Sequence, residues 1–244
     1  MIGVLNYSAV PLDFEGAVYI NKPRHFSSHD VVEIVRRYLG IRRVGHTGTL
    51  DPEAEGLLVL LLGRSTSQAE QFLNLEKEYE AWFLLGVATR SGDSDSEIES
   101  VSRNFYLSKK ELKQKLKKFE GKLWQKPPLF SALHWRGQRG YELARQGASF
   151  EIPARLVEVK FFKLKKLKKW RDFYFARCLI RCGKGVYIRS LAHQLGEELG
   201  CGGFLKRLIR TRVGTITLAR ALSLETFILL SQKKQWAKII KPIS

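Results

Sequence analysis

The longest uninterrupted apolar run of this chain spans residues 57–62, and a polar, glycine-rich stretch from 44 to 56 leads directly into it. A short apolar run bounded by turn residues is typical of a strand that is buried on both faces. Periodicity alone also allows a buried helical turn at this position. Either structure would fix the end of the polar stretch against the core.

Asp51 stands close to the point where the polar stretch meets the apolar run. Gly45 and Gly48 allow backbone conformations that other residues avoid, and Pro52 fixes φ directly after the aspartate. Functional side chains are often carried by loops that a rigid scaffold positions. Asp51 is therefore a candidate functional residue. An ordinary Asp-Pro turn is the alternative that the residues alone leave open.

The spacing of apolar residues predicts further elements along the chain. Strands are expected at 16–20, 79–86, 157–164, 172–182 and 211–218, and helices at 30–39, 66–75, 108–119, 141–145, 188–199 and from 224 onwards. Because strands and helices mix without a regular βαβ alternation, the pattern predicts an α+β fold with a mixed, mostly antiparallel central sheet flanked by helices and loops. No linker divides the chain, so residues 1–244 are expected to form a single domain.

The charge of the chain narrows the function further. Its 244 residues include 42 Lys and Arg against 24 Asp and Glu, which gives a formal net charge of +18 and a pI near 9.9. A soluble protein this basic usually binds a polyanion, either nucleic acid or an anionic membrane surface. Lysines gather in two clusters, at 109–118 and 163–171, although such a run is also compatible with an ordinary solvated face.

Metal and membrane functions find little support in the sequence. Cys178, Cys182 and Cys201 lack a second pair at zinc-site spacing, and the acids between 93 and 99 lack the spacing of a calcium loop. Three scattered cysteines indicate reduced thiols in a cytoplasmic protein. No signal peptide is expected, and the apolar run 57–62 is far too short to cross a bilayer.

Four groups of polar residues stand within apolar surroundings and are candidates for a site. They are His46 with Asp51, Lys77-Glu78-Tyr79, 131–134 with 141–145, and the segment 182–189.

The segment 182–189 allows two interpretations. Glycines flank Lys184 on both sides and could let the backbone cradle a phosphate, although the full nucleotide-binding pattern is missing. If the segment is extended, Tyr187 and Arg189 have the same parity and face one cleft. An arginine beside Asp51 would stabilise its ionised carboxylate, whereas a cation on a helix surface is the alternative for Arg189.

The segment 45–58 contains Gly45-His46-Thr47-Gly48-Thr49-Leu50-Asp51-Pro52, followed by Ala54 and Gly56-Leu57-Leu58. This run resembles the signature of the TruB family, the tRNA pseudouridine-55 synthases. The resemblance continues through four more blocks, which are Asn21-Lys22-Pro23 with Ser28, Lys77-Glu78-Tyr79, Pro127-Pro128 through Gly147, and 184–189 followed by Gly200-Cys201-Gly202. Several ordered blocks over most of the chain are far more specific than one motif.

The resemblance implies roles for individual residues. Asp51 matches the catalytic aspartate of the family. His46 matches the histidine that enters the RNA near the flipped uridine, and Tyr79 matches the tyrosine that stacks on the target base. Arg189 matches the arginine that pairs with the aspartate, and Tyr187 and Leu208 match residues that line the pocket. Lys184 is a further candidate RNA contact, and Lys22 matches a motif lysine with a structural role.

The family reaction breaks the N1–C1′ bond of uridine, turns the base and rejoins it through C5, with no cofactor and no metal. The resemblance therefore implies a pseudouridine synthase fold that acts on the T-arm of tRNA, without a guide RNA; a monomer is expected. The target uridine must leave the folded T-arm and stack on an aromatic ring. Asp51 could attack C1′ or remove the C2′ proton, and the sequence leaves both routes open.

The chain departs from the family pattern at His25, His134, Gly183 and Val186, none of which replaces a catalytic group. The family commonly continues into a small RNA-binding domain of the PUA type, which is expected to be absent here beyond a short extension from about residue 222. The lysine clusters could compensate for it, which predicts a steep salt dependence of tRNA affinity. The alternatives are a tRNA-binding or tRNA-folding protein that needs no catalysis, and a pseudouridine synthase that acts on another RNA.

Overall fold

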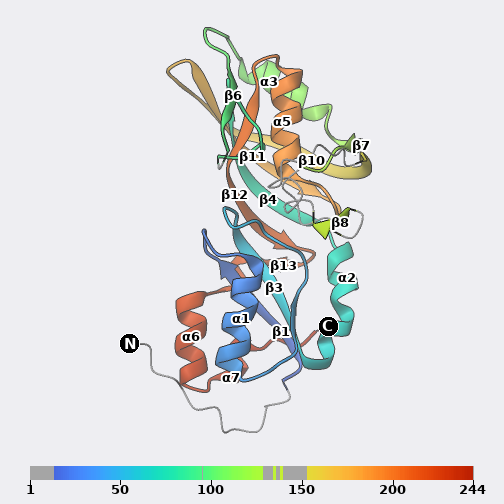
Figure 1. The fold of residues 1–244 in the computed structure, drawn as a ribbon, viewed down its shortest axis with the longest axis vertical. Helices are drawn as coiled ribbons and strands as arrows, with labels where there is room; N and C mark the ends of the chain where they lie inside the picture. The colour runs from blue at the N-terminus through green and yellow to red at the C-terminus, as the bar shows by residue number, and fades with distance from the viewer. Residues whose placement is uncertain (1–13, 95, 129–133, 136–137, 140–152, 244) are drawn as a thin grey trace. The chain divides into compact units, whose positions relative to one another are not determined.

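The computed structural model describes residues 14–94, 96–128, 134–135, 138–139 and 153–243 (Figure 1). The chain divides into two compact units. Unit 1 contains the residues up to Leu75 and those from Ile209 onwards, and unit 2 contains Glu76–Leu208. Most of the strand pairs in both units are antiparallel, and helices pack on the strands. This confirms the predicted α+β fold class.

Unit 1 is organised around strand β3 (Glu55–Leu62), whose last seven residues are all buried. β1 (Gly16–Lys22) pairs antiparallel along one edge of β3, and β14 (Leu222–Ser223) pairs parallel to β1. The other edge of β3 is shared by β2 (Val44–His46) and by the last part of β12 (Gly203–Val213). The predicted strand at 57–62 is therefore confirmed as the central strand of this unit.

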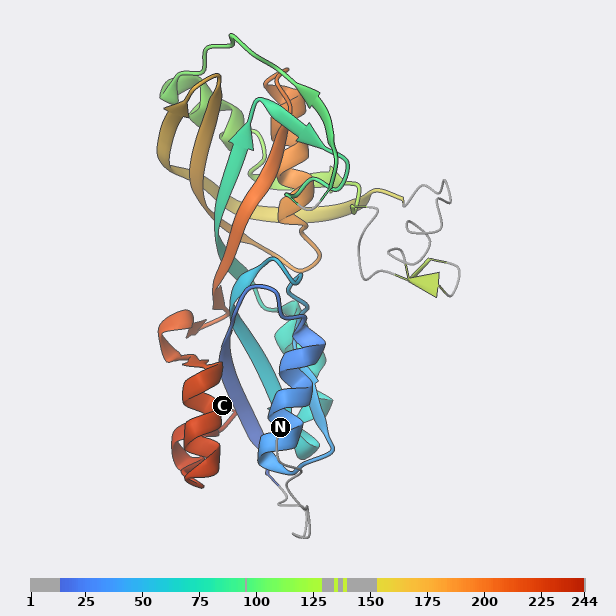
Figure 2. The same ribbon diagram turned by 60° about the vertical axis from the view of Figure 1, so that its left-hand side comes forward.

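Helices pack on both faces of β3, which explains why this strand is apolar at every position. Its alternate side chains point in opposite directions. One set packs with α1 (Ser28–Leu39), α6 (Leu224–Gln232) and the short α7 (Trp236–Ile239), and the other packs with α2 (Ala69–Asn74) and β13 (Ile216–Thr217) (Figure 2). The loop before β3 is thus anchored to a strand that has little freedom to move.

Helix α1 has a well-defined signal at each end. The Ser27 hydroxyl accepts a hydrogen bond from the Asp30 amide at 3.1 Å, and the Asp30 carboxylate accepts one from the Ser27 amide at 2.7 Å. This reciprocal pair is a capping box. At the other end, Gly40 adopts a left-handed conformation with φ of 66° and ends the helix. The helix begins slightly before the expected start at 30, because Ser27 is its cap.

The strands of unit 2 lie in the order β12-β4-β11-β10-β7. The long members are β4 (Lys77–Leu85), β11 (Phe173–Cys182) and β10 (Arg155–Trp170), and β7 (Gly121–Gln125) lies at the edge. β10 and β11 form a hairpin that turns at Arg171, a residue with φ of 54°.

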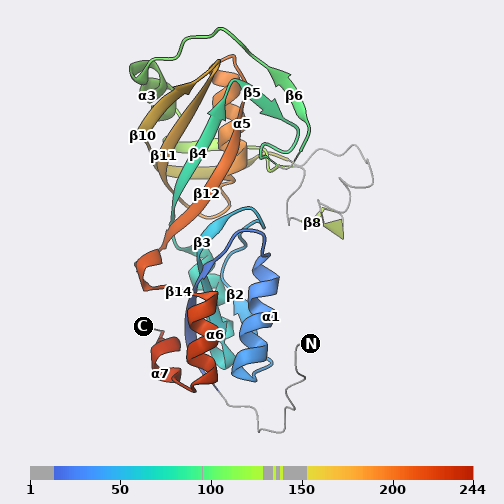
Figure 3. The same cartoon turned by 90° about the vertical axis from the view of Figure 1, so that its left-hand side faces the viewer.

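Two helices of unit 2, α3 (Lys109–Lys117) and α5 (Ile188–Glu198), lie together on one face of these strands (Figure 3). Two short strand pairs complete the described part of the unit, namely β5 (Val87–Thr89) with β6 (Ile98–Val101), and β8 (His134–Trp135) with β9 (Gln138–Arg139).

Some elements differ from the sequence expectation. β10 continues to Trp170, beyond the expected end at 164. Its second half is rich in lysine and lacks a regular apolar alternation, so the spacing of apolar residues did not predict it. The expected helix at 66–75 begins as a 3-10 turn (Gly63–Gln68) before α2. The strand expected at 211–218 is the end of β12 followed by β13. The expected helix at 141–145 lies outside the described residues.

No helix in the described part of the chain is long and apolar enough to cross a membrane.

Candidate active site

Asp51 lies in the loop that joins β2 to β3, and this loop is held along its length by groups of unit 1. The Asp51 carbonyl accepts a hydrogen bond from the Ala54 amide at 3.0 Å, which closes a tight turn around Pro52. Just before it, the Ser28 hydroxyl accepts from the Leu50 amide at 2.8 Å and lies 3.1 Å from the Leu50 carbonyl. The loop therefore begins against the first turn of α1, while the Asp51 side chain stays partly exposed.

Lys22, at the end of β1, also holds this loop in place through hydrogen bonds. Its side chain is fully buried, and its Nζ donates to the carbonyls of Pro23, Phe26 and Pro52 at 2.9, 2.6 and 3.3 Å. Burial lowers the pKa of Lys22 to about 8, and the negative charge of Asp51 opposes that shift. Because its donors are used on backbone carbonyls, Lys22 has the structural role that the resemblance implies.

Arg210, from β12, is a second buried cation at this loop. It is 2% exposed, and its guanidinium donates from Nε to the Leu57 carbonyl at 2.6 Å and from Nη2 to the Gly48 carbonyl at 3.0 Å. These two carbonyls lie on either side of Asp51 in the sequence. Gly56 lets β12 approach this closely, because a Cβ on it would lie 2.4 Å from the Arg210 carbonyl oxygen. One side chain therefore joins both ends of the segment that carries Asp51.

His46 lies at the end of β2, before the Asp51 loop. Burial lowers the pKa of its imidazole, and the positive charges of Arg210 and His29 lower it further. Its Nδ1 is buried and has no hydrogen-bond partner among the residues that the structure describes. A neutral imidazole suits these surroundings, because a protonated ring would place another charge beside Arg210.

This environment makes stability depend on pH in a defined direction. The pKa of His46 is lower in the folded protein than in the unfolded chain, so the unfolded chain binds a proton first as the pH falls. We expect the free energy of unfolding to decrease from pH 7.5 to pH 5.5, and to decrease less in His46→Gln. Urea denaturation at the two pH values checks this. Lys22, whose pKa is lowered to about 8, is present in both proteins, so its contribution cancels in the comparison. An equal decrease in both proteins would contradict the prediction.

In unit 2, Arg189 lies in the first turn of α5 and is buried, with 6% exposure. Its Nη1 lies 3.1 Å from Oδ2 of Asp93, and Oδ1 of Asp93 accepts from the Ser91 hydroxyl at 2.5 Å. Its burial excludes the alternative interpretation of Arg189 as a cation on a helix surface. Its predicted pairing with Asp51, a residue of unit 1, stays a prediction.

The beginning of α5 is fixed to β7 by a buried glutamine. Gln125 accepts from the Tyr187 amide at 2.7 Å and donates to the Tyr187 carbonyl at 3.1 Å, and the Ser190 hydroxyl donates to the Lys126 carbonyl at 2.8 Å. Because α5 begins at Ile188, the segment is not extended through Arg189. The expectation of a shared parity is wrong for Tyr187 and Arg189, since one precedes the helix and the other lies within it.

The remaining predicted site residues are also in unit 2. Tyr79 in β4 and Leu208 in β12 are buried, each with 9% exposure, and Tyr79 lies opposite Ile180 of β11. Lys184 is exposed in the turn between β11 and α5. The candidate residues thus form two groups. His46 and Asp51 lie in unit 1, and all the others lie in unit 2.

Sequence reasoning missed three residues that hold these groups in place: Arg210, Asp93 and Gln125. Asp93 was considered only as one of several loop acids. A buried charged or amide side chain gives no periodic signal, so only its partners in the fold identify it. The polar group 131–134 with 141–145 falls outside the described residues, except for His134 in β8.

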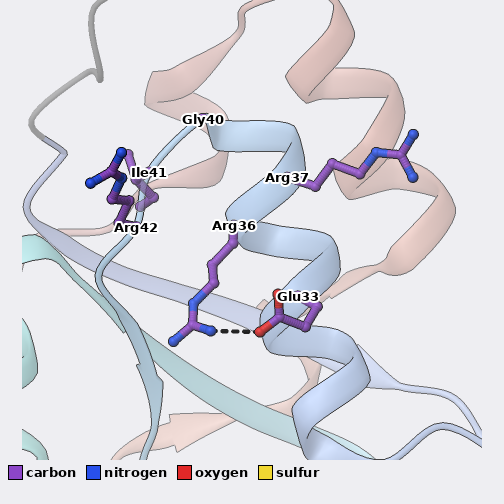
Figure 4. Close-up of a pocket in the computed structure, with 6 residues that line it drawn as sticks. All are labelled: Glu33, Arg36, Arg37, Gly40, Ile41 and Arg42. Atoms are coloured by element: carbon purple, nitrogen blue, oxygen red, sulfur yellow. Dashed lines mark hydrogen bonds and ion pairs between the residues drawn. The ribbon is translucent and has the colours of Figure 1, made fainter. Parts of the chain in front are cut away.

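A separate pocket lies at the other end of α1 from Ser28. It is lined by Glu33, Arg36, Arg37, Gly40, Ile41 and Arg42, and Arg36 pairs with Glu33 at 2.5 Å (Figure 4). A helix of 12 residues is about 18 Å long. The lining comes from the middle and end of α1 and from the residues after it, whereas the Leu50 contact lies at the first turn.

Comparisons with known proteins identify the family of the chain. Residues 36–188 match the family model for the TruB family pseudouridylate synthase (N terminal domain), and residues 189–243 match that for the tRNA pseudouridylate synthase B C-terminal domain. The chain is 40% identical over 211 residues to the tRNA pseudouridine synthase B of Pelotomaculum thermopropionicum, covering 86% of this chain and 67% of the relative. It is 42% identical to that of Francisella tularensis subsp. tularensis over 229 residues, covering 93% and 74%.

Solved structures share the fold. A chain of a Cbf5-Nop10-Gar1 complex matches with a TM-score of 0.69 and 25% identity, over 93% of this chain and 60% of the other. A chain of an H/ACA RNP bound to a substrate RNA containing 2′-deoxyuridine matches with a TM-score of 0.69 and 23% identity, over 93% and 59%. Because the two family models together match residues 36–243 and these relatives are 40% and 42% identical, the chain belongs to the TruB family of pseudouridylate synthases.

Proposed function

We propose that this protein converts uridine to pseudouridine at position 55 in the T-loop of tRNA, and that Asp51 acts at the ribose of the target nucleotide. The observation that carries the proposal is the fixation of the Asp51 loop by Arg210, Lys22 and Ser28. A carboxylate that must approach one atom of a flipped nucleotide needs a rigid backbone, because small displacements cost much of the rate. The proposed substrate and reaction follow the relatives, which are named tRNA pseudouridine synthase B.

The chemistry needs no group beyond the chain and the RNA. The N1–C1′ bond breaks, the base turns, and a C5–C1′ bond forms while the proton on C5 is lost and N1 gains one. Asp51 serves either as the nucleophile at C1′ or as the base at C2′. We assign stacking on the target base to Tyr79, and the ion pair with the Asp51 carboxylate to Arg189.

Asp93 supports the role that we propose for Arg189. Its carboxylate holds the buried guanidinium at 3.1 Å and is itself held by Ser91. An arginine fixed in this way loses little conformational entropy when it meets a second carboxylate. His46, Tyr187, Leu208 and Lys184 contact the RNA around the flipped nucleotide in this proposal.

The distribution of charge favours an RNA substrate. Residues 76–208 contain 28 of the 42 Lys and Arg residues but 15 of the 24 Asp and Glu residues, which gives this part of the chain a net charge of +13. Lysines and arginines that neutralise RNA phosphates release counterions and so provide affinity. We propose that the protein acts on tRNA as a monomer and without a guide RNA.

The proposal is tested by incubating the protein with unmodified tRNA transcript and mapping pseudouridine along the product. We expect one pseudouridine, in the T-loop. A matched transcript in which the T-loop uridine is replaced by cytidine is expected to remain unmodified. Product at another site or in another RNA would support the alternative pseudouridine synthase, and an unmodified transcript that is nevertheless bound would support the tRNA-binding alternative.

A further inference from the structure

The long strands of unit 2 have one buried face and one face that keeps contact with solvent. Along β4 and β11 every second residue is buried, and the residues between them are half-exposed or exposed. Helices α3 and α5 lie on the buried face, where Phe119 and Phe162 are in ring contact with centroids 6.1 Å apart (Figure 3). We call the opposite side the open face; cross-strand register places Trp82, Arg177 and Lys166 next to one another on it.

The open face carries aromatic rings at positions where a solvated sheet usually carries small polar side chains. Trp82 of β4, Phe161 of β10 and Phe175 of β11 all lie on it, and Trp170 at the end of β10 is 47% exposed. The rings of Trp170 and Phe175 pack with centroids 6.1 Å apart. Trp170 is exposed and the other three rings are half-buried. Apolar groups gathered on a partly exposed face are typical of a binding surface.

Cations lie directly against these rings. The guanidinium carbons of Arg177 and Arg207 lie 5.3 and 5.1 Å from the centre of the Trp82 ring. In the same way, Arg181 and Lys163 lie 5.1 and 4.9 Å from the centre of the Phe161 ring. Cation–π contacts of this kind hold long, flexible side chains in place, so less entropy is lost when they bind an anion.

The open face has an excess of positive charge. Six cations lie on it, namely Lys163, Lys166, Lys168, Arg177, Arg181 and Arg207, against the two acids Glu78 and Glu80. The acids pair with Arg181 and Arg177 at 2.9 and 2.8 Å and so orient two of the arginines. A surface that combines ordered cations with exposed rings complements RNA, which presents phosphates and stackable bases together.

We propose that the open face of unit 2 is a second RNA-binding surface, which takes unpaired nucleotides with phosphates at its arginines and lysines and a base against Trp170. It is distinct from the surface that carries the target uridine in the proposed function. Tyr79 belongs to the buried set of β4, whereas Trp82 belongs to the exposed set of the same strand. Trp82 holds Arg177 and Arg207 in position, and Trp170 has the exposed area that stacking requires.

The test uses a fluorescein-labelled oligocytidine of 12 nucleotides, because this RNA is unpaired and contains no uridine to modify. Its affinity is measured by fluorescence anisotropy at several salt concentrations. We expect Lys166→Gln/Arg177→Gln to weaken binding about tenfold and to reduce the slope of log affinity against log salt by about 1.4, since two phosphate contacts are lost. Trp170→Ala is expected to weaken binding about tenfold through lost stacking.

The matched control is Lys109→Gln/Lys110→Gln, which removes the same charge from exposed residues of α3 on the other side of the strands. It is expected to leave oligocytidine affinity within about twofold, and all variants are expected to modify tRNA at the wild-type rate at saturating enzyme. Equal weakening by the control and the open-face pair would overturn the proposal in favour of general charge attraction. Unchanged oligocytidine affinity in Trp170→Ala would also overturn the proposal. If the open-face variants kept their oligocytidine affinity but changed their sedimenting mass, the open face would instead be a surface for self-association.

Discussion

Asp51→Asn is expected to abolish pseudouridine formation, with a loss of about 10⁴-fold or more in the single-turnover rate. The substitution keeps the size of the side chain but removes the negative charge and most of the nucleophilicity and basicity that either route requires. Binding of tRNA is expected to persist, because most of the affinity comes from phosphate contacts elsewhere on this basic chain. Pseudouridine mapping and a tRNA binding isotherm measure the two effects separately.

Glu53→Gln is the matched control for this variant. Glu53 lies in the same loop, two residues from Asp51, and pairs with Arg24 and His25 at the surface. Exposed pairs of this kind contribute little to stability, so activity is expected to stay within a few-fold of wild type. If Asp51→Asn still modified tRNA at a comparable rate, Asp51 would be a turn residue after all.

The sequence predicted the part of this fold that depends on local patterns. The apolar run 57–62 indicated a doubly buried strand, and the structure confirms it because α1 and α6 pack on one face and α2 on the other. The same local reasoning identified the Asp51 loop, since glycine, aspartate and proline constrain their own backbone. The predicted start of α1 was also close to the observed one, because a capping box is formed by neighbouring residues.

The groups that hold the candidate site could not be predicted in this way. Arg210 contacts the Gly48 carbonyl across 162 residues, and Arg189 contacts Asp93 across 96. No periodicity connects residues so far apart, and a buried arginine in a strand looks like any other cation in the sequence. The parity argument for Tyr187 and Arg189 failed because it needed an extended backbone, whereas α5 begins between them.

Arg210 is expected to control the rate through the position of Asp51. In Arg210→Lys the charge is kept, but a single ammonium replaces the fork that reaches both the Leu57 and Gly48 carbonyls. One end of the loop then loses its tether. We expect the single-turnover rate to fall about 10- to 100-fold, with tRNA affinity within about twofold of wild type, because a small shift of a reacting group costs this much.

The same variant is expected to lose about 1–3 kcal/mol of stability, since a buried carbonyl is left without its charged donor. Rates are therefore measured well below the unfolding midpoint, where the protein remains folded. Arg212→Lys, two residues further along β12 and more exposed, makes the same chemical change and is expected to retain its rate. If Arg210→Lys lost stability but kept the wild-type rate when folded, Arg210 would support the fold without positioning Asp51. A loss of rate that larger amounts of folded enzyme cannot restore is the result that distinguishes a positioning residue.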